Sequence, residues 1–222
     1  MSGKPLSVVV LLSGRGSNFK AILDAVQAGR IPARIAAVIS NRGDAAGLDL
    51  AREAGIHTEV LDHKAFANRD DFDQALGNAI DRYDPGLVVL AGFMRILGAA
   101  LVERFTGRIF NIHPSLLPKF RGLHTHRKAI EAGEAEHGAS VHFVTAELDG
   151  GPVFLQARVP VLVDDDEDVL AARVLAQEHR IYPQAVNWFA TGRLGLEGET
   201  PVMDGHPLSK PLLMNELTDA DF

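Results

Sequence analysis

The sequence has 222 residues, 46% of them hydrophobic, with a formal net charge of −7 and no cysteine. That length and composition suit one globular domain of generous size or two small ones. The lack of cysteine excludes disulfides, thiolate nucleophiles and cysteine-bound zinc. The acidic balance argues against nucleic-acid binding, and no apolar run reaches the roughly 18 residues that span a membrane.

Strand-like and helix-like segments alternate through the first half of the chain. Aliphatic runs predict buried strands, and apolar residues at helical spacing predict helices. The predicted strands are 6–12, 35–39, 57–61, 87–90 and 108–112. The predicted helices lie around 19–26, 45–54, 72–83 and 97–105. This series predicts an α/β fold, a doubly wound and mostly parallel (mixed) sheet with helices on both faces.

The second half has a different pattern. Two strand patterns in 138–161 flank an acidic turn with two glycines. A helix is predicted from about 168 to 180, with Pro183 kinking or breaking its continuation. The acidic run 164–168 is favourable charge at the start of that helix. Residues 192–222 show only a weak pattern, and we expect a hairpin or a loose tail there.

The motif "SGRGSN", residues 13–18, joins the first strand to its helix. Glycines let backbone N–H groups converge at a helix N-terminus, which favours a bound phosphate. A dinucleotide fingerprint would need glycine where Phe19 stands and an acid where Asn41 stands. The motif therefore predicts a phosphate on a smaller ligand, and the alternative is a plain tight turn.

Asn111 and His113 stand two residues apart where the fifth strand ends, within "FNIHPSLLPKFRG". Side chains two apart share a strand face, and ligands of open α/β sheets bind beyond the carboxyl ends of the strands. An amide beside an imidazole can stabilise an oxyanion and move a proton. The alternative is a buried polar pair without a catalytic role.

A second polar group follows in "SVHFVTAELDGG". Ser140 and His142 share one face of a predicted strand, and Asp149 lies in the glycine-rich turn after it. A carboxylate next to an imidazole favours the charged ring and orients it. Asp149 is therefore a candidate partner of His113, although aspartate also forms turns without any such role.

Four histidines in the second half raise the question of a metal site. His124 and His126 are spaced for one strand face, and His137 and His142 follow. Nothing in the sequence supplies the carboxylates or cysteines that usually complete such a site. We expect no metal.

Taken together, these segments resemble the phosphoribosylglycinamide formyltransferase family, folate-dependent enzymes of purine synthesis. The resemblance covers about residues 6–191 and includes "SGRGSN", "VISNR", "LAGFMRIL", "NIHPSLLPKFRGLHTH", "HGASVHFVTAELDGGPVFLQ" and "QEHRIYP", in order. It implies catalytic roles for Asn111, His113 and Asp149. It implies contacts with glycinamide ribonucleotide at Gly16, Ser17, Asn18 and Glu178. It implies contacts with the folate at Arg69, Met94, Arg95, Ile96, Leu97 and Asn111, with Ser140 and His142 in support.

The resemblance also implies a reaction. The glycinamide amine would attack the formyl carbon of the co-substrate 10-formyltetrahydrofolate directly, with Asn111 and protonated His113 stabilising the oxyanion. We expect a single formyltransferase domain over 1–222, with a phosphate-binding half (about 1–100), a folate and catalytic half (about 101–191) and the tail. We further expect a cytoplasmic monomer or homodimer that acts on small-molecule substrates, without nucleic acid or membrane.

Three other functions stay open. Formyltetrahydrofolate hydrolases share the asparagine, histidine and aspartate, but usually add an N-terminal domain and would not need the phosphate loop. Methionyl-tRNA formyltransferase would need a further C-terminal domain and a basic surface. A non-catalytic folate- or nucleotide-binding module is the alternative of a different class.

Overall fold

The computed structural model describes residues 4–216. The chain divides into two compact units, residues 1–111 and 112–222. No helix among residues 4–216 is both long enough and apolar enough to cross a membrane.

The first unit contains a parallel sheet with the strand order β5–β4–β1–β2–β3. Residues 8–12 of the central strand β1 are completely buried, as expected for a strand that is covered on both faces. Strand β5 runs across the boundary between the units. The strands are β1 (Leu6–Leu12), β2 (Ala33–Ser40), β3 (His57–Val60), β4 (Leu87–Leu90) and β5 (Ile109–His113).

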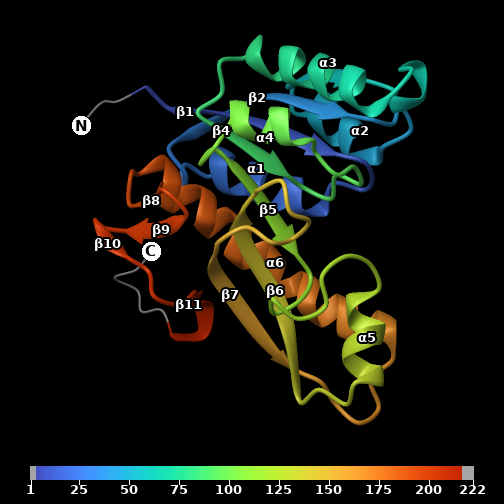
Figure 1. Cartoon of the computed structure of the whole chain (residues 1–222), viewed down its shortest axis with the longest axis vertical. Helices are drawn as coiled ribbons and strands as arrows, with labels where there is room; N and C mark the ends of the chain where they lie inside the picture. The colour runs from blue at the N-terminus through green and yellow to red at the C-terminus, as the bar shows by residue number, and fades with distance from the viewer. Residues whose placement is uncertain (1–3, 217–222) are drawn as a thin grey trace. The chain divides into compact units, whose positions relative to one another are not determined.

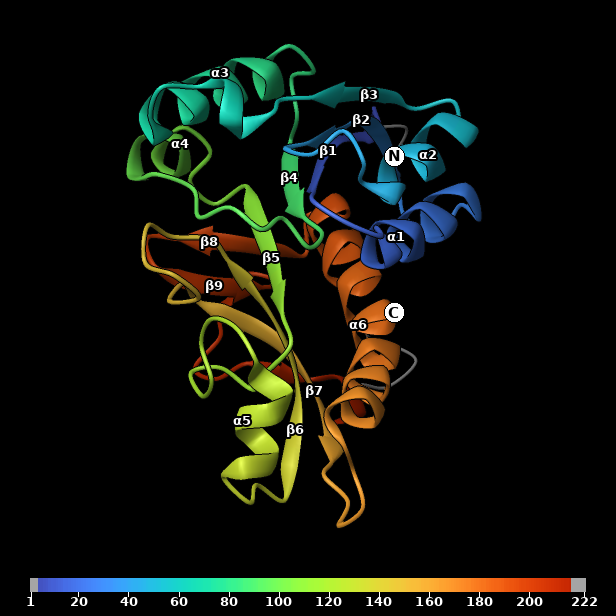
Figure 2. The same ribbon diagram turned by 90° about the vertical axis from the view of Figure 1, so that its right-hand side faces the viewer.

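Helices cover both faces of this sheet. Figure 2 shows α1 and α2 on one side of strands β1 to β4, and α3 and α4 on the other. Helix α3 begins at Arg69 because the side chain of the preceding residue, Asn68, accepts a hydrogen bond from the Asp71 N–H at 2.9 Å. The helices are α1 (Ser17–Gln27), α2 (Ala46–Glu53), the 3₁₀ turn η1 (His63–Ala65), α3 (Arg69–Asp81) and α4 (Ala99–Arg104).

The second unit contains the antiparallel pair β6 and β7, with β11 parallel to β7, and a separate antiparallel sheet of β8, β9 and β10. Helix α6 packs along β6 and β7 (Figure 1). The elements are α5 (Thr125–Glu131), β6 (Glu136–Phe143), β7 (Val153–Pro160), α6 (Glu167–Ala190), β8 (Leu194–Glu197), β9 (Thr200–Met203), β10 (His206–Pro207), β11 (Leu212–Leu213) and the 3₁₀ turn η2 (Met214–Glu216).

The predicted α/β class, with a mostly parallel mixed sheet, is confirmed. The predicted acidic helix start is also confirmed, because the Asp166 side chain caps α6 by accepting from the Val169 N–H at 2.8 Å. The hairpin predicted after residue 192 is present as β8 and β9. The last part of the predicted tail, 217–222, lies outside the described residues.

Two predictions were wrong. Helix α6 does not end near residue 180 but continues through Pro183 to Ala190. Ala185, Val186 and Trp188 are completely buried beyond the proline, so their packing offsets the backbone bond that proline cannot make. His124 and His126 do not lie on a strand either: His124 precedes helix α5 with a φ of +60°, and His126 lies within that helix.

Candidate active site

Strand β5 carries Asn111 and His113 on one face at its carboxyl end, as the sequence predicts. Asn111 lies opposite Leu90 of the neighbouring strand β4 and is partly exposed. The His113 side chain is only 7% exposed. The strand thus ends in a polar pair, of which the imidazole is buried.

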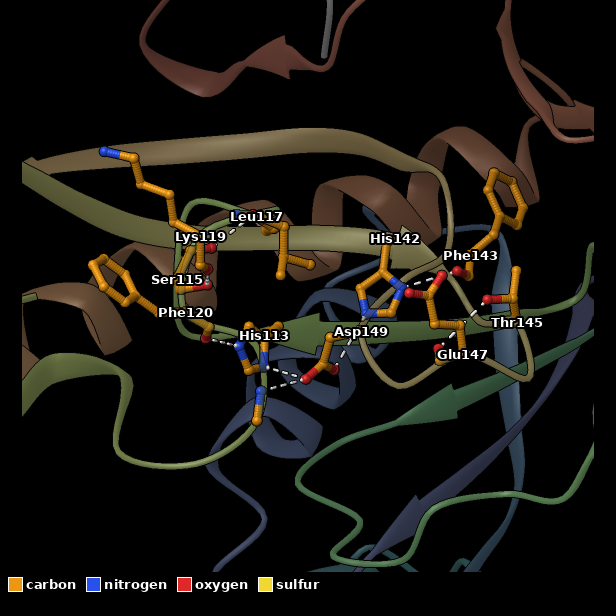
Figure 3. A network of polar contacts seen from close by, with 12 residues as sticks. His113, Ser115, Leu117, Lys119, Phe120, His142, Phe143, Thr145, Glu147 and Asp149 are labelled. Atoms are coloured by element: carbon orange, nitrogen blue, oxygen red, sulfur yellow. Dashed lines mark hydrogen bonds and ion pairs between the residues drawn. The ribbon is translucent and has the colours of Figure 1, made fainter. Parts of the chain in front are cut away.

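His113 lies between two oxygen acceptors, which Figure 3 shows. Its Nδ1 atom is 3.4 Å from Oδ2 of Asp149, and its Nε2 atom donates to the Phe120 carbonyl at 2.9 Å. Since a carbonyl oxygen can only accept, Nε2 carries a proton in this arrangement. A ring protonated on both nitrogens would therefore have a partner for each.

The turn after β6 positions Asp149. Its φ of +48° is in the left-handed region, which aspartate adopts more readily than most residues. Oδ2 also accepts a hydrogen bond from the Gly122 N–H at 2.9 Å, so the carboxylate is fixed from a second direction. A Cβ atom on residue 151 would lie 1.9 Å from the Phe143 carbonyl oxygen, so only glycine allows the turn to close this tightly.

His142 faces the other oxygen of Asp149, with Nε2 3.9 Å from Oδ1. Its Nδ1 atom donates to the Phe143 carbonyl at 2.9 Å, so the proton of the neutral ring is on that side. Burial lowers the pKa of His142, which keeps the ring neutral. The neutral ring thus presents Nε2 as an acceptor on the side of Oδ1.

Ser140 is part of a buried hydrogen-bond network. Its Oγ atom donates to the Ser115 carbonyl at 2.7 Å and accepts from the Leu117 N–H at 3.0 Å and from Nε2 of Gln156 at 2.8 Å. The Gln156 amide also donates to the Leu117 carbonyl at 3.0 Å. No base contacts the hydroxyl in this network, so Ser140 is placed to hold residues 115–117 and not to act as a nucleophile.

The predicted phosphate loop has the geometry of a tight turn that leads into a helix. Gly16 has a φ of +75° and immediately precedes α1. Ser17 and Asn18 are the first two residues of that helix, so their N–H groups lie at its positive end. This end of α1 can bind an anion.

The other predicted contact residues lie in two places. In the first unit, Arg69 is the first residue of α3, and residues 94–97 lie in the connection 91–98 between β4 and α4. Met94 and Ile96 are exposed at 68% and 50%, which is unusual for large apolar side chains in a short connection. In the second unit, Glu178 is buried in the middle of α6.

Some polar residues near these segments gave no signal in the sequence. Asp73 falls on the apolar side of a helix pattern, and Gln156 falls within a strand pattern, so each looks like an exception. Ser13 and Asn41 stand out in the sequence only as parts of the motifs 13–18 and 39–42. Within residues 4–216 no group of three or more histidine, cysteine, aspartate or glutamate side chains could hold a metal ion.

Comparison with known proteins places this geometry in a family. Residues 6–186 match the family model described as formyl transferase. The phosphoribosylglycinamide formyltransferase of Escherichia coli is 55% identical over 203 residues, which cover 91% of this chain and 96% of that protein. This chain belongs to the formyl transferase family.

Solved structures of the formyl transferase family share the fold as well. The phosphoribosylglycinamide formyltransferase of Coxiella burnetii is 51% identical, with a TM-score of 0.91 over 94% of this chain and 99% of that one. A further relative by sequence, the human trifunctional purine biosynthetic protein adenosine-3, is 43% identical over 193 residues, which cover 87% of this chain and 19% of that protein. All candidate site residues, from Gly16 to Glu178, fall within the formyl transferase match.

Proposed function

We propose that this protein transfers the formyl group of 10-formyltetrahydrofolate to the amine of glycinamide ribonucleotide, a step in purine biosynthesis. The relatives that support this reaction are named phosphoribosylglycinamide formyltransferase and match nearly the whole chain. The observation that carries the proposal is the buried pair of His113 and Asp149, 3.4 Å apart at the end of β5. The products are formylglycinamide ribonucleotide and tetrahydrofolate.

The reaction is a direct attack of the amine on the formyl carbon. A bond forms between the amine nitrogen and that carbon, and the bond from the carbon to N10 of the folate breaks. The amine nitrogen loses a proton and N10 gains one. In between, the formyl oxygen carries negative charge, which Asn111 and doubly protonated His113 stabilise as hydrogen-bond donors.

Asp149 orients His113 and stabilises its charged form. The Nε2 proton of His113 is donated to the Phe120 carbonyl in this structure, so this contact must open before that proton can reach the formyl oxygen. An ordered water molecule would relay protons between the amine and N10. No covalent enzyme intermediate is needed.

The substrates are assigned to separate segments. The loop that ends in Gly16, together with Ser17 and Asn18, binds the phosphate of glycinamide ribonucleotide, and Glu178 contacts the same substrate. The folate contacts Asn111, Arg69 and the connection 94–97. We place the protein in the cytoplasm, and a monomer or homodimer is our expectation for its assembly.

The experiment that tests the function follows both products. Purified protein is incubated with 10-formyltetrahydrofolate, with and without glycinamide ribonucleotide, and tetrahydrofolate, formate and the formylated amine are quantified. We expect tetrahydrofolate to form only with the amine, in a 1:1 ratio with formylglycinamide ribonucleotide. Formate release without the amine would instead assign a hydrolase, and binding without turnover would assign a non-catalytic module.

A further inference from the structure

The connection between β4 and α4 spans residues 91–98, and its second part, residues 94–98, lacks the backbone ladder of a helix or strand. It exposes Met94 and Ile96, while Leu97 is buried. Buried Leu97 and Arg95, whose guanidinium carbon lies 5.8 Å from the centre of the Phe72 ring, supply part of its packing. The hydrogen bonds at its two ends fix the backbone between these contacts.

The first end is held by Ser13. The Met94 N–H donates to Ser13 Oγ at 2.8 Å, and this hydroxyl donates in turn to Oδ1 of Asn41 at 2.5 Å. The Ser13 N–H donates to the Gly92 carbonyl at 3.1 Å. Ser13 and Asn41 are both buried, so these bonds are protected from water. One hydroxyl thus joins the loops that follow β1, β2 and β4.

The second end is held by Asp73 of helix α3. The Gly98 N–H donates to Oδ2 of Asp73 at 2.7 Å, and Nε of Arg69 lies 3.6 Å from the same oxygen. A Cβ atom on residue 98 would lie 2.6 Å from this oxygen, so the backbone approaches the carboxylate as closely as glycine allows. This charge-assisted bond fixes the point at which the connection enters α4.

The burial of the Asp73 carboxylate is unfavourable in free energy. It is 6% exposed, and its Oδ1 atom has no hydrogen-bond partner within residues 4–216. Burial raises the pKa of its carboxyl above the usual range. A partly satisfied carboxylate in a buried site costs stability. The side chain is thus better explained by what it positions than by what it contributes to the stability of α3.

We propose that Asp73 and Ser13 are positioning residues, which hold residues 94–98 in the conformation that binds the folate substrate. The inference rests on the proposed function, because it assigns the folate to this connection. Neither side chain needs to touch the substrate. Asp73 acts through the Gly98 N–H, and Ser13 acts through the Met94 N–H. Loss of the Asp73 bond should weaken folate binding and leave the amine substrate's site largely intact, whereas loss of the Ser13 bond should affect both sites, because Ser13 also begins the loop assigned to the phosphate.

The test compares matched variants by two readouts. Tetrahydrofolate binding is measured by calorimetry, and kcat and both KM values are measured in the transfer reaction. We expect Asp73→Ala to raise the folate Kd and KM roughly tenfold, the factor that about one hydrogen bond represents, with the amine KM within about twofold of wild type. Ser13→Ala should raise the folate KM in the same direction.

Conservative variants separate positioning from charge. Asp73→Asn keeps an oxygen that can accept from the Gly98 N–H, and Ser13→Thr keeps the hydroxyl, so both should restore most of the folate affinity. Asp70→Asn, an exposed neighbour on the same helix, is the control and should behave as wild type. Gly98→Ala leaves Asp73 in the sequence but pushes its Oδ2 atom away from the backbone of residue 98. This variant should raise the folate Kd even if Asp73→Ala fails to fold.

The outcomes are distinguishable. Unchanged folate Kd and KM in Asp73→Ala and Gly98→Ala, or equal losses for both substrates, would overturn the positioning role while leaving the proposed function in place. A reduced kcat with unchanged KM values would point to a smaller active fraction and would also overturn it. A wild-type protein that neither binds tetrahydrofolate nor transfers formyl groups would remove the proposed function and this inference with it.

Discussion

The Cα atom of Gly47 lies 2.8 Å from the position that a Cβ atom on Gly16 would occupy. Gly16 also has a φ of +75°, a backbone conformation that costs a side chain of L configuration about 1–2 kcal/mol. The phosphate loop and helix α2 therefore touch through two glycine backbones. A side chain at residue 16 must displace one of them.

Gly16→Val should therefore impair binding of the amine substrate. The displaced loop can no longer direct its N–H groups to the phosphate, and hydrogen bonds to a charged group are worth about 1.5–3 kcal/mol. We expect the KM for glycinamide ribonucleotide to rise roughly tenfold or more, with a much smaller change for the folate. Steady-state kinetics with each substrate varied in turn measures both values.

Gly14→Ala is the matched control in the same loop. A Cβ atom on residue 14 meets nothing within 4 Å, and its backbone is not in the left-handed region. We expect both KM values to stay close to wild type. Equal losses for the two substrates in Gly16→Val, or a normal amine KM, would contradict the assignment of the loop to the phosphate.

Ser140→Ala separates a structural hydroxyl from a nucleophile. The substitution leaves the Leu117 N–H without its acceptor and removes one acceptor of the Gln156 amide, and a buried donor without a partner costs about 1–3 kcal/mol. We expect the free energy of unfolding to fall by about that amount, measured with urea. The kcat should stay within roughly tenfold of wild type, and complete loss of turnover in a folded variant would indicate a covalent role instead.

The buried residue His137 should make the free energy of unfolding depend on pH in the acid range. Burial lowers its pKa to about 4, helped by the neighbouring His126, whose Nδ1 lies 3.2 Å from the His137 Nε2 atom. The unfolded chain binds this proton near the reference pKa of about 6.5. The contribution of neutral His137 to the free energy of unfolding is therefore fully present above pH 6.5 and is lost as the pH falls toward 4.

The measurement is the free energy of unfolding by urea at several pH values. The shift from about 6.5 to about 4 corresponds to about 3 kcal/mol of acid destabilisation from this one residue. His137→Gln should lose that part of the pH dependence, and His206→Gln, on the exposed strand β10, should keep it. Identical slopes in wild type and His137→Gln would show that His137 is not the group responsible.

The alternating elements of the first half were predictable from local patterns. Residues 6–12 form a continuous aliphatic run, and such a run indicates a strand buried on both faces wherever it occurs. The apolar spacing of helix α3 was equally local. What the pattern misplaced were ends: α4 begins at residue 99 and not 97, because Gly98 is extended and bonded to Asp73.

The errors arose where tertiary packing outweighs local preference. Pro183 breaks an isolated helix, yet buried residues beyond it keep α6 continuous. The spacing of His124 and His126 suggested a strand, although His124 adopts a left-handed conformation that starts helix α5. A single sequence contains the preference of each residue but not the packing that overrides it.

The candidate site was partly predictable for a related reason. Asn111, His113 and Asp149 stand out because polar residues interrupt apolar strands or occupy glycine-rich turns. Asp73 cannot be recognised in this way, since its partner is a backbone N–H of residue 98, 25 positions away. The bond goes to the main chain, so no side-chain pattern in the sequence pairs Asp73 with that residue.

The proposed mechanism depends on the pair of His113 and Asp149. Asp149→Asn keeps the shape of the side chain but removes the negative charge that lies 3.4 Å from Nδ1 of His113 and, in this mechanism, orients the imidazole. We expect kcat to fall by roughly 10²–10³, the typical cost of losing one oxyanion partner, with little change in either KM. Glu147→Gln, in the same turn but exposed, is the control and should keep kcat within about twofold.

The most direct test is the double-mutant cycle of Asp149→Asn and His113→Asn, with kcat for formyl transfer measured in all four proteins. If Asp149 acts through His113, the double variant should be hardly worse than the poorer single variant, because residues that act as a unit are strongly non-additive. Losses that multiply across the cycle would show that the two residues act independently, and would contradict the mechanism.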